Sequence, residues 1–174
     1  MIPYIYYPTI EIDTDYIKEL AFSDRKIPCN GSGFRFLVNG DPVLSRFREK
    51  YPFMADIYNI INHRPFNNSL SPHIDTGRHA ALNIPVSPPL TTPTIFYKLP
   101  EAYNYSIINN LKMLSGDLTE VFRNILDRPT LINTSIPHSA VNMDNTNRVV
   151  FTWTVDNKYT FEDAVKFFSE YEQD

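Results

Sequence analysis

The sequence predicts a mainly β fold of antiparallel strands, a sandwich or a jelly roll. Eight short segments are rich in β-branched and aromatic residues, and turn-forming stretches rather than helices separate them. The chain also has 12 Phe and 11 Tyr, which suit strands. The predicted strands are GFRFLVN from Gly33, HAALNIPV from His79, TIFYKL from Thr94, YNYSII from Tyr103, EVFRNI from Glu120, PTLINTSI from Pro129, HSAVN from His138 and RVVFTWTV from Arg148.

Two helices are predicted on the N-terminal side of most of these strands. Asp13 or Thr14 can cap a short helix that runs to about Ala21. Residues 41–62 have apolar side chains close to helical spacing and predict a second helix, which Pro52 would kink or divide.

A third helix is predicted at the C-terminal end, where Thr160 and Asp163 resemble a weak capping box before FEDAVKFFSEYE. No repeat, low-complexity tract or linker divides the 174 residues, so we expect one domain. We expect a helical N-terminal support with one or more strands over residues 1–70 and a metal-binding jelly-roll core over residues 71–155. A short C-terminal helix is expected over residues 156–174.

Composition and charge exclude several classes of function. The net charge is −4, from 16 basic and 20 acidic residues, and the basic residues are scattered, so bulk nucleic acid is not an expected partner. No stretch approaches the roughly 18 apolar residues of a membrane span, and the first residues lack the pattern of a signal peptide. With Cys29 as the single cysteine, we expect a soluble, cytoplasmic protein with no membrane partner.

A candidate metal site begins in the segment SPHIDTGRHAALNIPV, where His73 and Asp75 lie two positions apart at what reads as the start of a strand. Side chains two apart in a strand point to the same face. A jelly roll can bring distant strands together, so His138 can supply a third ligand. Two imidazoles and one carboxylate on one side of a metal form the facial triad of non-haem Fe(II) oxygenases, which leaves three adjacent coordination positions open.

Arg148 is a candidate anchor for a carboxylate. It follows His138 by ten residues and opens the next predicted strand. The strand residues between His138 and the turn cover roughly 13 Å, a distance that suits a five-carbon diacid lying between a metal and a guanidinium. Alternation places Arg148, Val150 and Thr152 on one face, opposite Val149, Phe151 and Trp153.

Together, HID at 73–75, PHSAVN around His138 and the following Arg148 resemble the H-x-D…H…R pattern of Fe(II)/2-oxoglutarate-dependent oxygenases. The short HSAVN stretch looks most like the aspartyl/asparaginyl and prolyl hydroxylase branches. The resemblance covers about Ser71 to Val155. It implies a double-stranded β-helix (jelly-roll, cupin-like) core, Fe(II) as cofactor, 2-oxoglutarate and O₂ as co-substrates, release of succinate and CO₂, and usually hydroxylation.

One departure concerns the distant carboxylate of 2-oxoglutarate. The family's common R-x-S pattern would place a serine where this chain has Val150. A second contact to that carboxylate would therefore come from Tyr97 or Thr152.

Other polar residues can be interpreted either as part of the site or as structural. Asn83 could contact the inner carboxylate of the co-substrate or be a buried amide, and Asn142 could enter the pocket or stabilise a turn. Arg78 could hold an acidic substrate or cap its loop. His63, His79 and Cys29 are interpreted as structural.

Two functions of different classes follow. The first is a dioxygenase that hydroxylates an amino acid, a peptide side chain or another small substrate. The alternative is a non-catalytic cupin-like module that binds a metal or a small molecule. A co-substrate anchor such as Arg148 favours the first, because neither a pure binding module nor an iron or manganese enzyme that does not use 2-oxoglutarate needs one.

Overall fold

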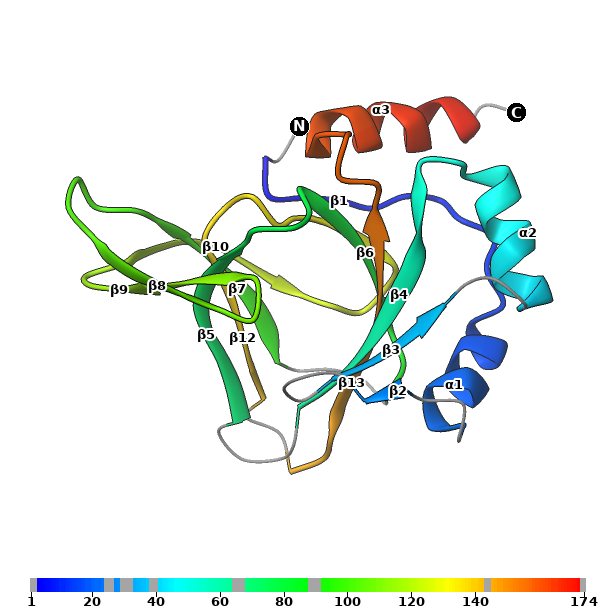
Figure 1. The fold of residues 1–174 in the computed structure, drawn as a ribbon, viewed down its shortest axis with the longest axis horizontal. Coiled ribbons are helices and arrows are strands. Elements are labelled where there is room, and N and C mark those ends of the chain that lie inside the picture. The colour runs from blue at the N-terminus through cyan, green and yellow to red at the C-terminus, as the bar shows by residue number, and fades with distance from the viewer. Residues whose placement is uncertain are drawn as a thin grey trace.

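Two antiparallel sheets face one another in the computed structural model, and three short helices lie outside them (Figure 1). The structure describes residues 3–23, 27–28, 33–37, 41–63, 68–87, 92–142 and 145–172. Cys29 lies outside these residues. Within them, no helix is long and apolar enough to cross a membrane.

Seven strands form the larger sheet and six form the smaller one. In spatial order the larger sheet contains β1 (Ile5–Tyr6), β11 (Thr130–Asn133), β6 (Ala80–Pro85), β13 (Arg148–Val155), β4 (Met54–His63), β3 (Gly33–Leu37) and β2 (Ile27–Pro28). The smaller sheet contains β10 (Thr119–Ile125), β7 (Pro93–Lys98), β12 (His138–Asn142), β5 (Asn68–Asp75), β9 (Leu111–Ser115) and β8 (Asn104–Ile108).

The chain alternates between the two sheets along its core, except that it stays in the smaller sheet from β7 to β10. Strands β4, β6, β11 and β13 belong to the larger sheet, whereas β5, β7, β10 and β12 belong to the smaller one. This alternation of antiparallel strands is a double-stranded β-helix, so the predicted jelly-roll fold is confirmed. The β8–β9 hairpin extends the smaller sheet beyond β5.

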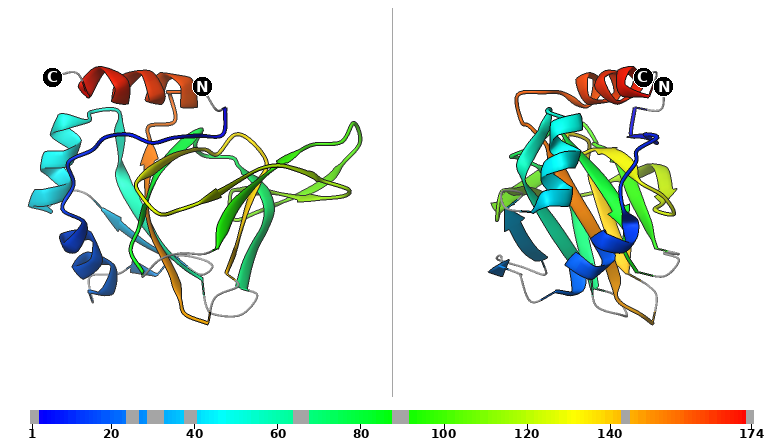
Figure 2. Two further views of the ribbon diagram at one scale, coloured as in Figure 1. Left: turned by 180° about the vertical axis from the view of Figure 1, so that it is seen from behind. Right: turned by 90° about the vertical axis from the view of Figure 1, so that its right-hand side faces the viewer.

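Local sequence signals account for all three helices. The side chain of Asp13 accepts hydrogen bonds from the Asp15 and Tyr16 amides at the start of α1 (Thr14–Phe22), and Asp41 caps α2 (Pro42–Lys50) in the same way. Helix α3 (Phe161–Tyr171) begins with the predicted capping box of Thr160 and Asp163. Figure 2 shows α1 and α2 on the outer side of the larger sheet and α3 across one end.

The prediction of one long helix over 41–62 is wrong in its second half. Helix α2 ends at Lys50, and Met54–His63 is strand β4. Pro52 separates the two, since a proline cannot continue the helical hydrogen bonds. Strand β4 then pairs with both β13 and β3, and these cross-strand bonds outweigh the local helical spacing.

The main hydrophobic core lies between the larger sheet and the helices. Val149, Phe151 and Trp153 of β13 pack there with residues such as Phe47 and Phe168, and the Trp153 indole donates a 2.7 Å hydrogen bond to the Ala55 carbonyl. Alternation along β13 turns Arg148, Val150 and Thr152 to the other side, between the two sheets. The predicted division of β13 into two faces is thus confirmed, and the space between the sheets is left for polar side chains.

Candidate metal centre and adjoining cavity

Three candidate ligands meet on the inner face of the smaller sheet. His73 and Asp75 are at the end of β5, not at the start of a strand as predicted, and His138 opens β12. His73 and His138 are direct cross-strand partners, so their side chains share a face. All three are buried, and one ligand atom from each lies within 4.8 Å of the others. The His73 Nε2 to Asp75 Oδ1 distance is 3.5 Å.

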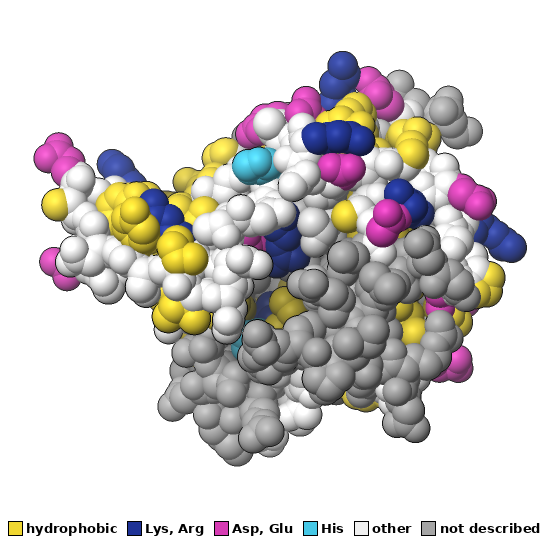
Figure 3. Space-filling model, viewed as in Figure 1, with side chains coloured by type: hydrophobic (Ala, Val, Ile, Leu, Met, Phe, Trp, Pro, Cys, Tyr) yellow, Lys and Arg dark blue, Asp and Glu magenta, His cyan; other side chains and the backbone are white. Residues whose placement is uncertain are grey.

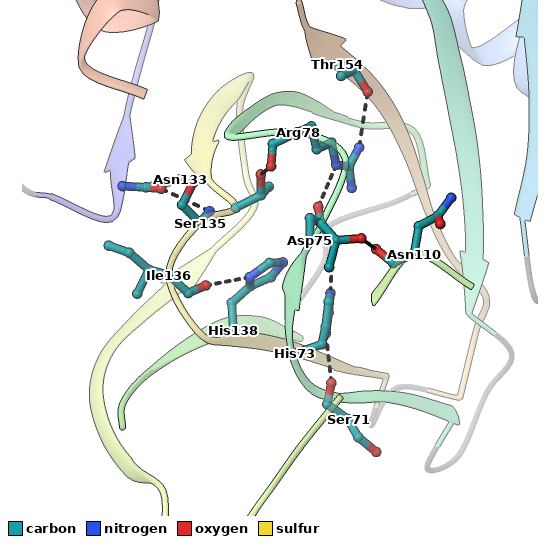
Figure 4. Close-up of polar contacts among 12 residues, drawn as sticks. Ser71, His73, Asp75, Arg78, Asn110, Asn133, Ser135, Ile136, His138 and Thr154 are labelled. Carbon is teal, nitrogen blue, oxygen red and sulfur yellow. Dashed lines mark hydrogen bonds and ion pairs between the residues drawn. The ribbon is translucent and has the colours of Figure 1, made fainter. Parts of the chain in front are cut away.

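Both imidazoles are held by their Nδ1 atoms, as Figure 4 shows. Nδ1 of His73 lies 2.8 Å from the Ser71 carbonyl oxygen, and Nδ1 of His138 lies 2.9 Å from that of Ile136. Because a carbonyl oxygen only accepts, each Nδ1 carries the proton and donates it. Each Nε2 therefore keeps its lone pair, which is how a metal-binding histidine is usually oriented.

The two carboxylate oxygens of Asp75 have different surroundings. Oδ2 accepts a 2.5 Å hydrogen bond from Nε of Arg78, whereas Oδ1 is buried without a hydrogen-bond partner among the residues that the structure describes. A buried carboxylate oxygen left without a partner is costly unless a ligand satisfies it. Oδ1 faces the histidines and is therefore the oxygen available to a metal.

The protonation states of the three residues suit cation binding at neutral pH. Burial, with a smaller contribution from His73, lowers the pKa of His138 to about 4, and burial also lowers the pKa of His73. Burial by itself would raise the pKa of Asp75, but the charge of Arg78, joined at low pH by those of the protonated His138 and His73, holds it below its ordinary value. The cluster therefore offers two neutral imidazoles and one carboxylate without first losing protons.

A cavity between the sheets adjoins this cluster. His73, His138 and Arg78 line it from one side, and Arg148 and Thr152 of β13 line it from the other. Asn83 of β6 also lines the cavity, together with Ile61, His63, Leu70, Thr94, Ile132, Thr134, Ala140 and Val150. In Figure 3 the surface is hollowed in its middle, and basic side chains are visible inside the hollow.

Several polar atoms in this cavity are buried without a partner. Nε of Arg148, Oγ1 of Thr152 and Oδ1 of Asn83 form no hydrogen bond within the described part of the chain. Arg148 is 3% exposed, and no carboxylate among the described residues pairs with it. Burial lowers its pKa to about 10, so it remains a cation at neutral pH. A buried cation beside unpaired hydrogen-bonding groups indicates a place for an anionic ligand.

Of the residues predicted to contact the co-substrate, Tyr97 and Asn142 do not line this cavity. Tyr97 follows Phe96, which points inward, and the Tyr97 hydroxyl lies 2.9 Å from Oγ of Ser139, the residue beside His138. Neither Tyr97 nor Ser139 lines the cavity. Of the two proposed second contacts for the distant carboxylate, Thr152 has the better position.

Asn142 stabilises a turn instead of lining the cavity. Its amide donates to the carbonyls of His63 and Thr146, at 2.9 and 2.8 Å, and so ties the end of β12 to the end of β4. This is the structural reading that its place before the turn had left open.

His63 and Arg78 both line the cavity, and the structure adds to what the sequence indicated for each. His63, interpreted as structural, is buried and lines the cavity as the cross-strand partner of Arg148. This pairing depends on β4, which was predicted as helix. Arg78, for which a substrate contact or a loop cap was expected, lines the cavity, and its Nε donates a hydrogen bond to the Asp75 carboxylate.

Comparison of the sequence with models of protein families and with curated proteins finds no match. Solved structures with a similar arrangement include E. coli YcfD, at 11% identity and a TM-score of 0.46, over 97% of this chain and 53% of that one. EvdMO1 is 14% identical with a TM-score of 0.44, over 87% of this chain and 47% of that one. Vicilin from Corylus avellana (hazelnut) is 12% identical with a TM-score of 0.44, over 78% of this chain and 33% of that one. The chain thus spans a third to about half of these proteins, and its function has to be argued from its own residues.

Proposed function

We propose that this chain is a non-haem Fe(II)- and 2-oxoglutarate-dependent dioxygenase. Its substrate would be an amino acid, a peptide side chain or another small molecule, which it would hydroxylate. One observation carries the proposal: the His73, Asp75 and His138 cluster and the buried Arg148 line or adjoin the same cavity, and no described carboxylate pairs with Arg148.

The three donors fit an open iron site better than a closed structural metal site. Two imidazole nitrogens and one carboxylate oxygen are the facial triad of Fe(II) oxygenases, and three ligands leave room for a chelating co-substrate and O₂. Bound iron would supply the oxidising chemistry, in which 2-oxoglutarate, O₂ and a C–H bond of the substrate give succinate, CO₂ and a hydroxyl group. The protein's part is to hold both organic molecules against that face.

Arg148 supports 2-oxoglutarate as the co-substrate. A five-carbon diacid that chelates a metal at one end presents a second carboxylate at the other, and a guanidinium pairs with a carboxylate through two parallel hydrogen bonds. Thr152 lies two residues further on the same face of β13 and can donate its hydroxyl hydrogen to the same group. Asn83 on the neighbouring strand β6 lines the same cavity and would contact the co-substrate from its side.

Succinate formation tests the proposal without knowledge of the substrate. Fe(II)-loaded protein with 2-oxoglutarate and O₂ should release succinate slowly, because uncoupled turnover needs only these components. His138→Ala should abolish this release by loss of a ligand, and Arg148→Met should release succinate only at much higher 2-oxoglutarate concentrations, because the anchor is lost. If folded, iron-loaded protein gave no succinate across a broad panel of candidate substrates, the non-catalytic binding module would be the better account.

A further inference from the structure

We propose that Arg78 is a positioning residue that fixes the Asp75 carboxylate so that a single oxygen is presented to the metal. The inference rests on the metal site proposed above. Its starting point is the 2.5 Å hydrogen bond from Nε of Arg78 to Oδ2 of Asp75, which leaves Oδ1 facing His73. Figure 4 shows Arg78 behind the carboxylate, on the side away from both histidines.

Arg78 is itself held in place by the opposite sheet. Its Nη1 lies 3.4 Å from Oγ1 of Thr154 on β13, and its carbonyl oxygen accepts a 3.0 Å hydrogen bond from Oγ1 of Thr134. The side chain is 19% exposed. The guanidinium therefore connects the carboxylate on β5 to the larger sheet, and it is not a freely moving surface charge.

The neighbouring loop is fixed as well. The amide and the hydroxyl of Thr76 both donate to the carbonyl of Asn110, at 3.0 and 2.7 Å, where the β8–β9 hairpin turns. Asn109 and Asn110 both have positive φ, as this tight hairpin turn requires. The Asp75 amide donates to the Thr134 carbonyl at 3.2 Å. Asp75 is thus held by its backbone and by one of its two oxygens.

The chemical consequence is a carboxylate restricted to one metal bond. A free aspartate can bind a metal through one oxygen or through both, and the second bond would occupy a position that the co-substrate or O₂ needs. With Oδ2 engaged by Arg78, only Oδ1 remains. Arg78 would thereby keep the open face of the triad open.

Orientation and charge predict opposite effects on metal affinity. A cation close to the site repels a divalent metal, so removing its charge would by itself tighten metal binding. Losing a group that orients a ligand typically weakens metal binding about 10- to 100-fold. The sign of the change therefore distinguishes a positioning residue from a nearby charge.

The experiment compares Arg78→Lys and Arg78→Met with Arg123→Met. Arg123 is a matched control, because it pairs with Glu120 at the same sequence spacing but lies on the surface. Affinities for Fe(II) and Mn(II) are measured by competition with a chelating dye, and the visible spectrum of the Co(II)-substituted protein reports the coordination geometry. Circular dichroism establishes that each variant is folded.

For a positioning role, both Arg78 variants bind metal about 10- to 100-fold more weakly, and their Co(II) spectra change, whereas Arg123→Met resembles the wild type. Lysine fails although it keeps the charge, since one ammonium cannot reproduce the planar fork that spans Asp75 and Thr154. Unchanged binding by Arg78→Lys with tighter binding by Arg78→Met would overturn the inference and leave Arg78 as a charge alone. A wild-type protein that bound metal no better than His138→Ala would instead refute the proposed metal site.

Discussion

Replacing Arg148 by methionine separates the proposed co-substrate anchor from the metal site. Methionine keeps an unbranched, flexible side chain, although a shorter one, and removes the charge and the hydrogen-bond donors. Arg148 is on β13, in the other sheet from His73, Asp75 and His138, so Fe(II) affinity should stay close to that of the wild type. The affinity for 2-oxoglutarate should fall strongly.

The size of the loss follows from the burial of Arg148, which is 3% exposed. Removing one partner of a buried ion pair typically costs about 3 to 5 kcal/mol, because the other charge is left uncompensated. At about 1.4 kcal/mol per tenfold change, the dissociation constant for 2-oxoglutarate should rise by roughly two to three and a half orders of magnitude. Arg148→Lys should lose less, since it keeps the charge but not the two parallel hydrogen bonds.

The ligand-free protein gives an independent readout of the same residue. Burial lowers the pKa of Arg148 to about 10, which corresponds to about 3 kcal/mol of unfavourable charge burial at every pH below about 10. Without 2-oxoglutarate, Arg148→Met should therefore have an equal or higher free energy of unfolding, by up to about 3 kcal/mol.

The assay is calorimetric titration of 2-oxoglutarate into anaerobic metal-loaded protein, with urea denaturation of the ligand-free form. Arg128→Met is the control, because Arg128 is exposed and pairs with Asp127 on the surface. Unchanged 2-oxoglutarate affinity together with reduced stability would refute the reasoning and assign Arg148 a structural role.

Three further predictions concern the metal ligands and their surroundings. His138→Ala should lose most of its bound iron, measured by metal analysis after gel filtration, because two ligands are too few to hold it; full occupancy would remove His138 from the triad. In metal-free protein the free energy of unfolding should be highest above pH 6.5 and fall as the pH drops to about 4. The reason is that His138 has a pKa of about 4 in the folded state and about 6.5 in the unfolded state, so the unfolded state binds the proton first. That loss should reach about 3 kcal/mol and be smaller in His138→Gln, and urea titrations at pH 7 and 4.5 that give equal stabilities would contradict it. Thr152→Val should leave the stability of the ligand-free protein unchanged or higher, since Oγ1 has no partner among the described residues. It should lower the affinity for 2-oxoglutarate about 2- to 10-fold, which corresponds to the loss of one hydrogen bond. Unchanged affinity would exclude Thr152 from the anion site.

Much of the architecture could be predicted because local signals and tertiary structure agree. The caps at Asp13 and Thr160 fix two helix starts, and the turn-forming stretches delimit most strands. Where the two conflict, the prediction was wrong: Met54–His63 has helical spacing but is a strand, because β13 and β3 pair with it on both sides. Strand β9 was missed because only its pairing with β5 and β8 identifies it.

The candidate site also contains some residues that the sequence could predict and others that only the structure identifies. His73, Asp75 and Arg148 could be chosen from spacing and strand alternation, since these depend only on the chain itself. The position of His63 beside Arg148 depends on strand register. Arg78 is in a loop, where no periodicity predicts the direction of a side chain, and its bond to Asp75 emerged only from the structure. Tyr97 follows the inward-facing Phe96, and Ser139 follows His138. The hydrogen bond between Tyr97 and Ser139 could therefore be found only once β7 and β12 were aligned.

The most direct test of the account is the visible spectrum of anaerobic protein mixed with Fe(II) and 2-oxoglutarate. Chelation of iron by a 2-oxo acid produces a metal-to-ligand charge-transfer band, so one spectrum reports the metal and the co-substrate together. The account predicts that the band develops in the wild type, is absent in His138→Ala, and in Arg148→Met develops only at much higher 2-oxoglutarate concentrations. A folded wild-type protein that retained Fe(II) and showed no band at saturating 2-oxoglutarate would contradict it.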